Sequence, residues 1–338
     1  MTTHATPPVL GVPGASPALS ERLRDGLERV DALLRQVVDH DDPFIARASE
    51  HLVAAGGKRF RPLLTLLAAE LGDGINDDVV SAAAGVELTH LASLYHDDVM
   101  DEATVRRGVA SVNAAYDNST AILVGDLLFG KASELVAGLG AEAVLIQAQT
   151  FVRLCSGQIR DDQGCPEGVD PVDYYLGVLA DKTGVLIATA ARYGVMFSGG
   201  SPETVEILRS YGEKVGVAFQ LADDLIDIAS DADDSGKLPG TDLREGVDTL
   251  AVLRFRAVAH PGNADDARLL ELLDGDLGDD AALAEALRLL RAHPALEQAR
   301  EETHAVARDA QALLEPLPDS DAKAALQALA LSVVERVG

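Results

Sequence analysis

The chain has 338 residues, 47% of them hydrophobic, so it is long enough to bury a large core. It carries 28 Lys and Arg against 55 Asp and Glu, which gives a formal charge of −27. A protein that binds nucleic acid needs a basic surface to neutralise the phosphate backbone. Nucleic acid is therefore excluded as an expected partner. Aromatic residues make up only 4% and Trp is absent, a composition that favours helices packed on helices over a sheet.

No targeting or membrane-spanning segment is expected. The N-terminal stretch lacks the basic region and apolar run of a secretory signal. No apolar stretch reaches the ~18–20 residues that cross a bilayer. The two cysteines, Cys155 and Cys165, match no metal-binding or redox spacing. These features predict a cytoplasmic protein with two free thiols.

Hydrophobic periodicity predicts helices along almost the whole chain. Residues 1–17 are rich in Pro, Thr and Gly and are expected to form a flexible tail, which leaves 18–338 as one all-α domain. From Ser20 onwards, apolar side chains recur at three- and four-residue steps. The same pattern predicts helices over residues 43–56, 62–72, 78–101, 117–138, 141–160, 171–198, 202–228, 246–259, 265–275, 280–292, 296–315 and 320–336. No convincing strand pattern is present, so we expect a large single-domain helical bundle.

A first cluster of carboxylates lies in the segment Leu88 to Gly108, LTHLASLYHDDVMDEATVRRG. On a helix, Asp97 and Asp101 lie one turn apart on the same face, next to Asp98. Such a triplet presents hard oxygen ligands from two successive turns, which suits Mg²⁺ completed by water and substrate phosphates. In so acidic a chain, a solvated helix face is the alternative explanation for one triplet.

A second triplet, Asp223, Asp224 and Asp227, lies in the segment FQLADDLID among apolar residues. Carboxylates in an apolar setting are costly unless they are paired or bind a metal, so this copy weakens the explanation by a solvated surface. Gln220 lies one turn earlier and faces the same way, as a neutral hydrogen-bonding group.

Basic residues follow a glycine pair in the segment GGKRFRP, residues 56–62. Lys58, Arg59 and Arg61 cluster there, and Pro62 is expected to occupy the first position of the next helix. Cations just ahead of a helix N-terminus form a good anion site, although an exposed basic loop would look the same.

Further cations lie close to both triplets. Arg106 and Arg107 end the first acidic segment, where arginine suits bidentate phosphate contact. Lys182 and Thr183, in ADKTG, are expected to begin an apolar helix, and Lys237 lies in the loop just after the second triplet. Two acidic triplets with nearby cations predict a divalent-metal site for a polyphosphate.

The motifs GGKRFRP, HDDVMD with RRG, SGQIRDD, DKTG, FQLADDLID and GKLPGTDLREG follow one another in this order. From about Gly56 to Leu250 the chain therefore resembles a trans-type polyprenyl diphosphate synthase, of the isoprenyl diphosphate synthase family. The resemblance implies an isoprenoid synthase bundle around a deep central cavity, usually a homodimer. It also implies Mg²⁺-dependent head-to-tail condensation of isopentenyl diphosphate with an allylic diphosphate to give a polyprenyl diphosphate.

The resemblance also assigns roles to individual residues. The metal ions would be held by Asp97, Asp98, Asp101, Asp223, Asp224 and Asp227. The allylic diphosphate would be bound by Arg106, Lys182 and Lys237. Isopentenyl diphosphate would be bound by Lys58, Arg61, His90 and Arg107. Thr183 and Gln220 would lie near the developing allylic cation. The residues implied to be catalytic are Asp97, Asp98, Asp101, Asp223, Lys182, Thr183 and Gln220. Val247 and Ala251 depart from the family, which often has Lys and Pro there, and put one auxiliary phosphate contact in doubt.

Product length is expected to depend on the helix face that precedes Asp97. In this family, bulky aromatic residues four and five positions earlier stop chain growth, but here these residues are Ser93 and Ala92. The next residues on this face are also non-aromatic: Thr89, Val86 and Gly85. Tyr95 is expected to point to the opposite face. The prediction is a product longer than farnesyl, in the hexaprenyl to decaprenyl range; geranylgeranyl diphosphate is the alternative if a residue such as Phe129 closes the channel.

Three other functions remain as alternatives. A class I terpene cyclase would carry a second motif of the Asn/Asp–Ser/Thr–Glu type instead of DDLID. A di-iron protein is suggested by the spacing of Glu87 with His90 and of Glu301 with His304, but it leaves both triplets unexplained. A non-catalytic regulatory subunit would be expected to lack aspartates from one motif, and both are complete here.

Overall fold

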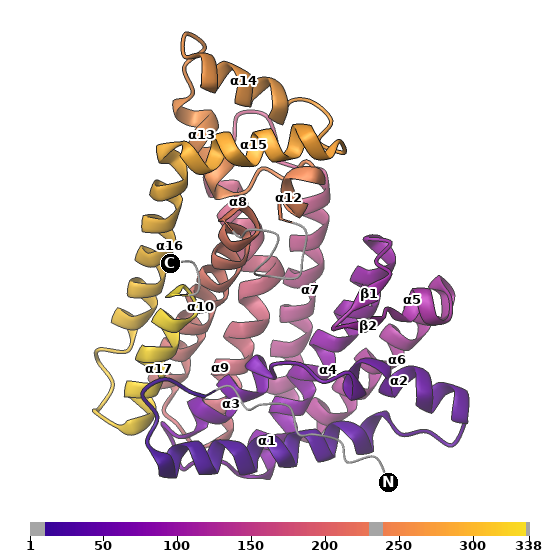
Figure 1. Cartoon of the computed structure of the whole chain (residues 1–338). Helices are drawn as coiled ribbons and strands as arrows, with labels where there is room; N and C mark the ends of the chain where they lie inside the picture. Colours follow the sequence, from indigo (N-terminus) through magenta and orange to yellow (C-terminus); the bar gives the residue numbers. More distant parts are fainter. Residues whose placement is uncertain (1–10, 230–238, 336–338) are drawn as a thin grey trace. The chain divides into compact units, whose positions relative to one another are not determined.

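The computed structural model describes residues 11–229 and 239–335, and the described chain is almost entirely helical (Figure 1). It divides into two units. The first unit contains the described residues up to 152, with 186–212 and 314–328. The second contains 153–185, the described part of 213–313, and the residues from 329.

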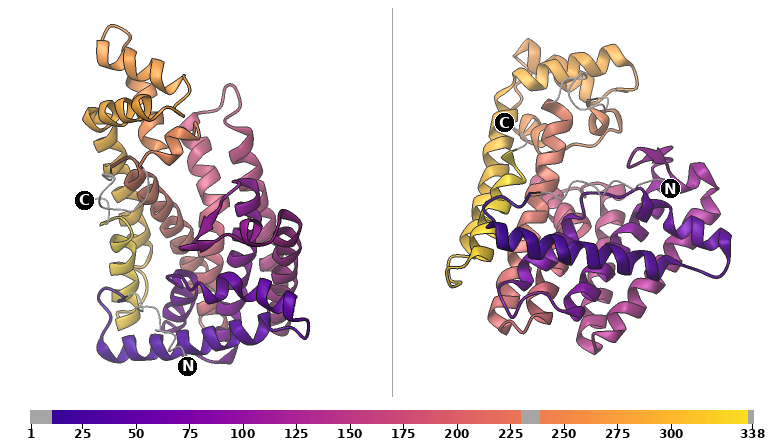
Figure 2. Two further views of the ribbon diagram at one scale, coloured as in Figure 1. Left: turned by 45° about the vertical axis from the view of Figure 1, so that its right-hand side comes forward. Right: turned by 60° about the horizontal axis from the view of Figure 1, so that its bottom comes forward.

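The first unit is built on α4, whose long apolar faces are buried against neighbouring helices α3 and α6. Helix α1 also runs along α3 and α4, as Figure 2 shows. The elements of the first unit are α1 (Pro17–Val38), α2 (Pro43–Ala54), α3 (Phe60–Ala69), α4 (Asp77–Met100), β1 (Val105–Arg106), β2 (Val109–Ala110), α5 (Val112–Ala115), α6 (Asn118–Gly138), the first part of α7 (Ala141–Gln163), α9 (Val185–Phe197) from residue 186, the first part of α10 (Pro202–Ala229) and most of α17 (Asp321–Ser332).

The second unit combines the remaining parts of α7 and α10 with a series of shorter helices. These are α8 (Pro171–Leu179), the π-helical turn η1 (Ala180–Gly184), α12 (Thr241–Arg244), α13 (Leu250–Val258), α14 (Ala264–Leu273), α15 (Asp280–Ala292) and α16 (Pro294–Leu313). Within it α13 packs against α16 and α8, and α14 packs against α15. Several helices begin where a side chain caps them, for example Asp170, which accepts from the backbone N–H of Val172 and Asp173.

The all-α prediction is confirmed, and most predicted helices differ from the observed ones by a few residues at their ends. Helix α1 begins at Pro17, so the last residue of the predicted tail is helical, and Ser16 caps it through the N–H of Leu19. Residues 1–10 of that tail lie outside the described residues. Among the described residues, no helix is both long and apolar enough to cross a bilayer.

Three local predictions were wrong. Helix α3 begins at Phe60, which puts Pro62 at the third helical position; its missing N–H costs nothing there because the first-turn N–H groups have no partner within the helix. The predicted helix over 171–198 is interrupted by η1. A two-stranded antiparallel hairpin, β1 with β2, was not predicted because two-residue strands leave no alternating pattern.

Candidate active site

The first aspartate triplet lies where α4 ends. Asp98 is completely buried, and Arg106 donates from Nε to its Oδ1 at 2.6 Å. Arg106 Nη2 is also 4.0 Å from Oδ2 of Asp101, which caps the helix. Burial raises the pKa of the Asp98 carboxyl, although the Arg106 guanidinium opposes that shift. The other oxygen of Asp98, Oδ2, is buried and has no hydrogen-bond partner.

The hairpin that carries the two arginines is fixed to the end of α4. Asn113 Nδ2 donates to the carbonyl oxygens of Asp98 and Ala103, both at 3.0 Å. Arg107 and Gly108 form its two-residue turn and both have positive φ, 54° and 78°, as a type I′ turn requires. The turn therefore explains the glycine that follows the paired arginines and directs the two side chains to different partners.

The loop before α3 has left-handed backbone at Gly56, Gly57 and Arg59. A Cβ on Gly57 would lie 2.8 Å from the guanidinium carbon of Arg107, so only glycine leaves room for that side chain. Arg107 donates from Nη1 to the carbonyl oxygens of Gly56, in a short hydrogen bond, and of Leu52 at 3.4 Å. The two basic motifs are thus packed against each other.

Arg61, His90 and Arg107 come together in the first unit, as predicted. The pKa of Arg61 is lowered to about 10, mainly by burial; Glu87 opposes the shift and nearby Arg107 adds to it. Burial, followed by Arg61 and Arg107, holds the pKa of His90 well below its usual 6.5, so this imidazole is neutral at neutral pH. The Nε of Arg61 is buried without a hydrogen-bond partner. The predicted Lys58 is exposed on the same loop.

The second triplet lies on α10 in a more acidic setting. Asp224 is buried and accepts from the hydroxyl of Tyr175, in a short hydrogen bond, and from Nε2 of Gln220 at 2.9 Å. Asp227 Oδ2 accepts from the backbone N–H of Asp242 at 3.0 Å. The pKa of Asp224 is raised to about 6 and that of Asp242 to about 7, mainly by burial. Neighbouring carboxylates contribute to both shifts, whereas the hydrogen bonds from Tyr175 and Gln220 oppose the shift of Asp224.

Tyr175 and Asp242 are site residues that the sequence reasoning missed. Asp242 was visible in the segment GTDLREG, but nothing in its spacing placed it beside Asp227. Tyr175 lies in an ordinary apolar helix segment and gave no signal.

Lys182 and Thr183 lie in η1, within the second unit. Lys182 Nζ pairs with Asp161 Oδ2 at 2.7 Å, and Thr183 Oγ1 donates to Oε1 of Gln220 at 3.3 Å. Asp181 anchors the turn by accepting from Arg153 Nε at 2.8 Å and from Arg160 at 3.0 Å. These residues do not begin a helix as predicted, since α8 leads directly into η1; such π turns are frequent at functional sites. The predicted Lys237 lies outside the described residues.

A metal ion fits the donor set of both triplets. The partnerless Oδ2 of Asp98 and the mutually repelling carboxylates around Asp224 are hard oxygen acceptors that a divalent cation would satisfy. Among the described residues, no three His, Cys, Asp or Glu side chains converge to hold a metal by themselves.

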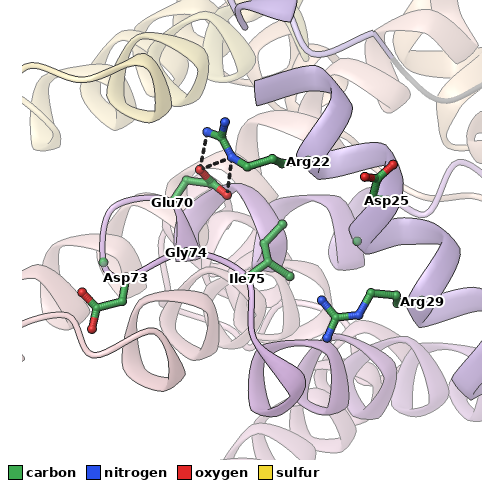
Figure 3. A pocket seen from close by; sticks show the side chains of 9 residues that line it. Arg22, Asp25, Arg29, Glu70, Asp73, Gly74 and Ile75 are labelled. Atoms are coloured by element: carbon green, nitrogen blue, oxygen red, sulfur yellow. Dashed lines mark hydrogen bonds and ion pairs between the residues drawn. The ribbon is translucent and has the colours of Figure 1, made fainter. Parts of the chain in front are cut away.

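A hollow of about 430 Å³ in the first unit has a different character (Figure 3). Its arginines are already engaged, since Arg22 pairs with Glu70 at 2.6 Å and Arg29 with Asp77 at 2.6 Å. No predicted site residue lines it. We therefore do not assign the substrates to this hollow.

Comparisons with known proteins identify the family. The family model described as polyprenyl synthetase matches residues 42–290. A nonaprenyl diphosphate synthase of Mycobacterium tuberculosis is 48% identical, over 100% of both chains. Geranylgeranyl pyrophosphate synthase from Corynebacterium glutamicum, solved with calcium and isoprenyl diphosphate, matches with 43% identity and a TM-score of 0.85, covering 96% of this chain and 98% of that one. A decaprenyl diphosphate synthase from Rhodobacter capsulatus matches with 34% identity and a TM-score of 0.86, covering 95% and 99%.

These matches cover the motifs from which the resemblance was inferred. The helical fold and both complete aspartate triplets belong to the matched region. The chain is a member of the polyprenyl synthetase family.

Proposed function

We propose that this chain is a trans-prenyltransferase that condenses isopentenyl diphosphate with an allylic diphosphate, head to tail, to give a polyprenyl diphosphate. The observation that carries the proposal is a buried set of complementary groups in the first unit. Asp98 offers a partnerless oxygen to a cation, and Arg61 offers a partnerless N–H to an anion. A metal-bound diphosphate and a second, metal-free diphosphate would satisfy the two groups.

The chemistry requires separation of charge, because breaking an allylic C–O bond leaves a carbocation and a diphosphate. Mg²⁺, the ion we propose for the triplets, would act as a Lewis acid on the leaving oxygen. Arg106 and Lys182 add fixed positive charge for the diphosphate. Thr183 and Gln220, already hydrogen-bonded to each other, present neutral dipoles to the developing cation. The apolar helices exclude the water that would otherwise capture it.

The second substrate is assigned to the residues around Arg61. Arg61 and Arg107 supply guanidinium donors that suit phosphate oxygens, and the exposed Lys58 adds a point charge. His90 is neutral, so it acts by hydrogen bonding rather than by charge. The released diphosphate is the proposed base for the final proton.

We propose a product in the hexaprenyl to decaprenyl range. Ala92 is fully buried, Ser93 is small, and the hydroxyl of Tyr95 donates to the carbonyl of Ala48, so its ring is fixed against α2. Further along the same helix, Gly85 and Thr89 line a small pocket of about 10 Å³. The similarity to nonaprenyl and decaprenyl synthases supports long products. The 43% identity to a geranylgeranyl synthase keeps that shorter product as the second candidate.

Substituting this helix face tests the assignment of product length. Ser93→Phe, or Ala92→Phe, would place a ring in the proposed path of the growing tail, so the products should become shorter than those of the unmodified enzyme. Thr89→Phe, about one helical turn further on, should give products of intermediate length. Tyr95→Phe is the control, because its ring lies against α2 and the products should be unchanged. Unchanged lengths in all the Phe variants of this face would show that the tail does not pass along α4.

A homodimer in the cytoplasm completes the proposal. Helices α6 and α7 expose apolar side chains that a second copy would cover: Ile122, Leu123, Val144, Leu145 and Val152. Leu123 and Val152 are 67% and 63% exposed. Leu123→Glu should shift the mass measured by analytical ultracentrifugation from dimer to monomer, and an unmodified protein that sediments as a monomer would contradict this part.

A further inference from the structure

Glu87 is a buried carboxylate among the arginines of the first unit, and none of the substrate assignments uses it. It lies on α4, one turn before His90, and only 1% of its surface is exposed. Acidic side chains are rarely buried this completely unless they are paired. Its spacing with His90 suggests a metal-binding pair on sequence grounds, but its partners in the structure are cations.

Two arginines with strained backbone converge on the same oxygen of Glu87. Arg59 donates from Nη1 to Oε1 at 2.9 Å, and Arg107 Nη2 is 3.8 Å from that atom. Arg59 and Arg107 both have left-handed backbone, with φ of 47° and 54°. Such conformations persist in residues other than glycine only where the surroundings hold them. Glu87 is the acceptor that these two turns share.

The contacts divide the arginines into two kinds. Arg59 is internal: besides Glu87 it donates to Asp31 at 2.8 Å and to the carbonyl oxygen of Val53 at 3.2 Å. Arg107 is held mainly by backbone carbonyls, and its approach to Glu87 is at the outer limit of an ion pair. Arg61 has a buried N–H without a partner. Positive charge therefore remains on the two arginines assigned to isopentenyl diphosphate.

We propose that Glu87 is a positioning residue for isopentenyl diphosphate, an inference that rests on the proposed function. Its hydrogen bond with Arg59 stabilises the loop before α3. Its partial attraction of Arg107 keeps that side chain beside Arg61 without neutralising it. Without Glu87, three guanidinium groups would repel one another in a poorly solvated site, and the arrangement that receives the diphosphate would be lost.

The test compares Glu87→Gln and Glu87→Asp with Glu70→Gln. Glu70 is the control because it is also the carboxylate partner of an arginine in the first unit, Arg22, and it lines the hollow of Figure 3, which no predicted site residue lines. Melting temperature reports the structural loss in each variant. Calorimetric titration gives the Kd of isopentenyl diphosphate and of pyrophosphate, and steady-state kinetics give kcat and the KM of each substrate.

We expect Glu87→Gln to raise the Kd and KM for isopentenyl diphosphate at least tenfold. The KM of the allylic diphosphate should change less than threefold, and Glu87→Asp should recover part of the affinity because it keeps the charge. Glu70→Gln should lower the melting temperature and leave both affinities unchanged. Unchanged or tighter binding of isopentenyl diphosphate by Glu87→Gln would overturn the inference, as would an equal loss in Glu70→Gln.

Arg59→Lys provides a second variant if Glu87→Gln does not fold. It keeps the charge but not the forked contact with Glu87 and Asp31, and it should also raise the KM of isopentenyl diphosphate, although Arg59 is not assigned to bind it. No change in KM would overturn the positioning role. If the unmodified enzyme does not turn over isopentenyl diphosphate, the proposed function fails, and the affinities for pyrophosphate still decide the role of Glu87.

Discussion

The two aspartate triplets share the pattern DDxxD, but the surroundings of their buried members are of opposite charge. In the first unit, Asp98 is paired with Arg106, which also lies among the arginines that lower the pKa of His90. In the second unit, Asp224 has the neutral partners Tyr175 and Gln220, and Asp242 adds a further carboxylate. The same motif thus occurs once among cations and once among acids.

This difference indicates that the two regions bind ions of opposite charge. The first region can attract anions before any metal is present, because the Nε of Arg61 has no hydrogen-bond partner and Arg107 approaches Glu87 only to 3.8 Å. In the second region, ionisation of the buried carboxylates is unfavourable until a cation neutralises them. This region is therefore suited to bind metal ions. Substitutions in the cationic region and in the acidic region should therefore have different effects.

The largest expected effect comes from Asp98. Asp98→Asn keeps the size of the side chain but removes its charge, and leaves Arg106 with only the more distant carboxylate of Asp101, at 4.0 Å. We expect kcat to fall by about 10²–10³-fold, as for the loss of a main electrostatic stabiliser. Asp77→Asn, an exposed aspartate at the start of the same helix, is the control and should retain full turnover. Turnover of isopentenyl diphosphate with farnesyl diphosphate measures both, and a fully active Asp98→Asn enzyme would refute the metal assignment.

The acidic region should make the metal-free protein less stable as the pH rises. The pKa values of Asp224 and Asp242 in the folded state, about 6 and about 7, lie above the ordinary 3.8, so the folded protein binds more protons than the unfolded chain. The stability that this uptake provides is complete below pH ~4 and is lost as the pH rises through 6 to 7.

Asp242→Asn removes one of the repelling charges and should raise the free energy of unfolding at pH 8 by about 1–3 kcal/mol. At pH 5 the gain should be much smaller, since Asp242 is then protonated in the folded protein. Urea denaturation in EDTA at both pH values measures the difference. An equal effect at pH 5 and pH 8 would show that repulsion between carboxylates is not the cause.

A smaller effect of opposite sign is expected from the cationic region. The pKa of His90 lies well below 6.5 in the folded state, so the unfolded chain binds the extra proton, and stability is lost as the pH falls below about 6.5. His90→Gln should remove this loss, which amounts to about 1.4 kcal/mol for each pH unit by which the pKa is lowered. The free energy of unfolding of both proteins at pH 7 and pH 5 tests this. An equal loss of stability at pH 5 in both proteins would show that a group other than His90 causes it.

The fold was predictable because apolar side chains recur with the helical period from Ser20 to the last helix. The exceptions depend on contacts between distant residues. Gly157 allows α7 to approach η1, since a Cβ there would lie 2.5 Å from the backbone nitrogen of Lys182. The hairpin depends on Asn113, which binds the end of α4. Neither contact leaves a local pattern in the sequence.

The candidate site was predictable as a set of residues but not as an electrostatic arrangement. Motif order identified both triplets and the basic loops, and the structure brings Arg61, His90 and Arg107 together. Glu87 was noticed only as a possible iron ligand, because its burial between two arginines depends on the fold. Asp242 was missed for the same reason, since its backbone N–H meets Asp227 from 15 residues further along the chain.

The measurement that tests the central claim most directly is chromatography of the dephosphorylated products after incubation with farnesyl diphosphate, isopentenyl diphosphate and Mg²⁺. We predict polyprenols in the hexaprenyl to decaprenyl range, and none in the presence of EDTA. Farnesol recovered without any longer product would contradict the proposed activity, and products that end at geranylgeraniol would contradict the predicted length.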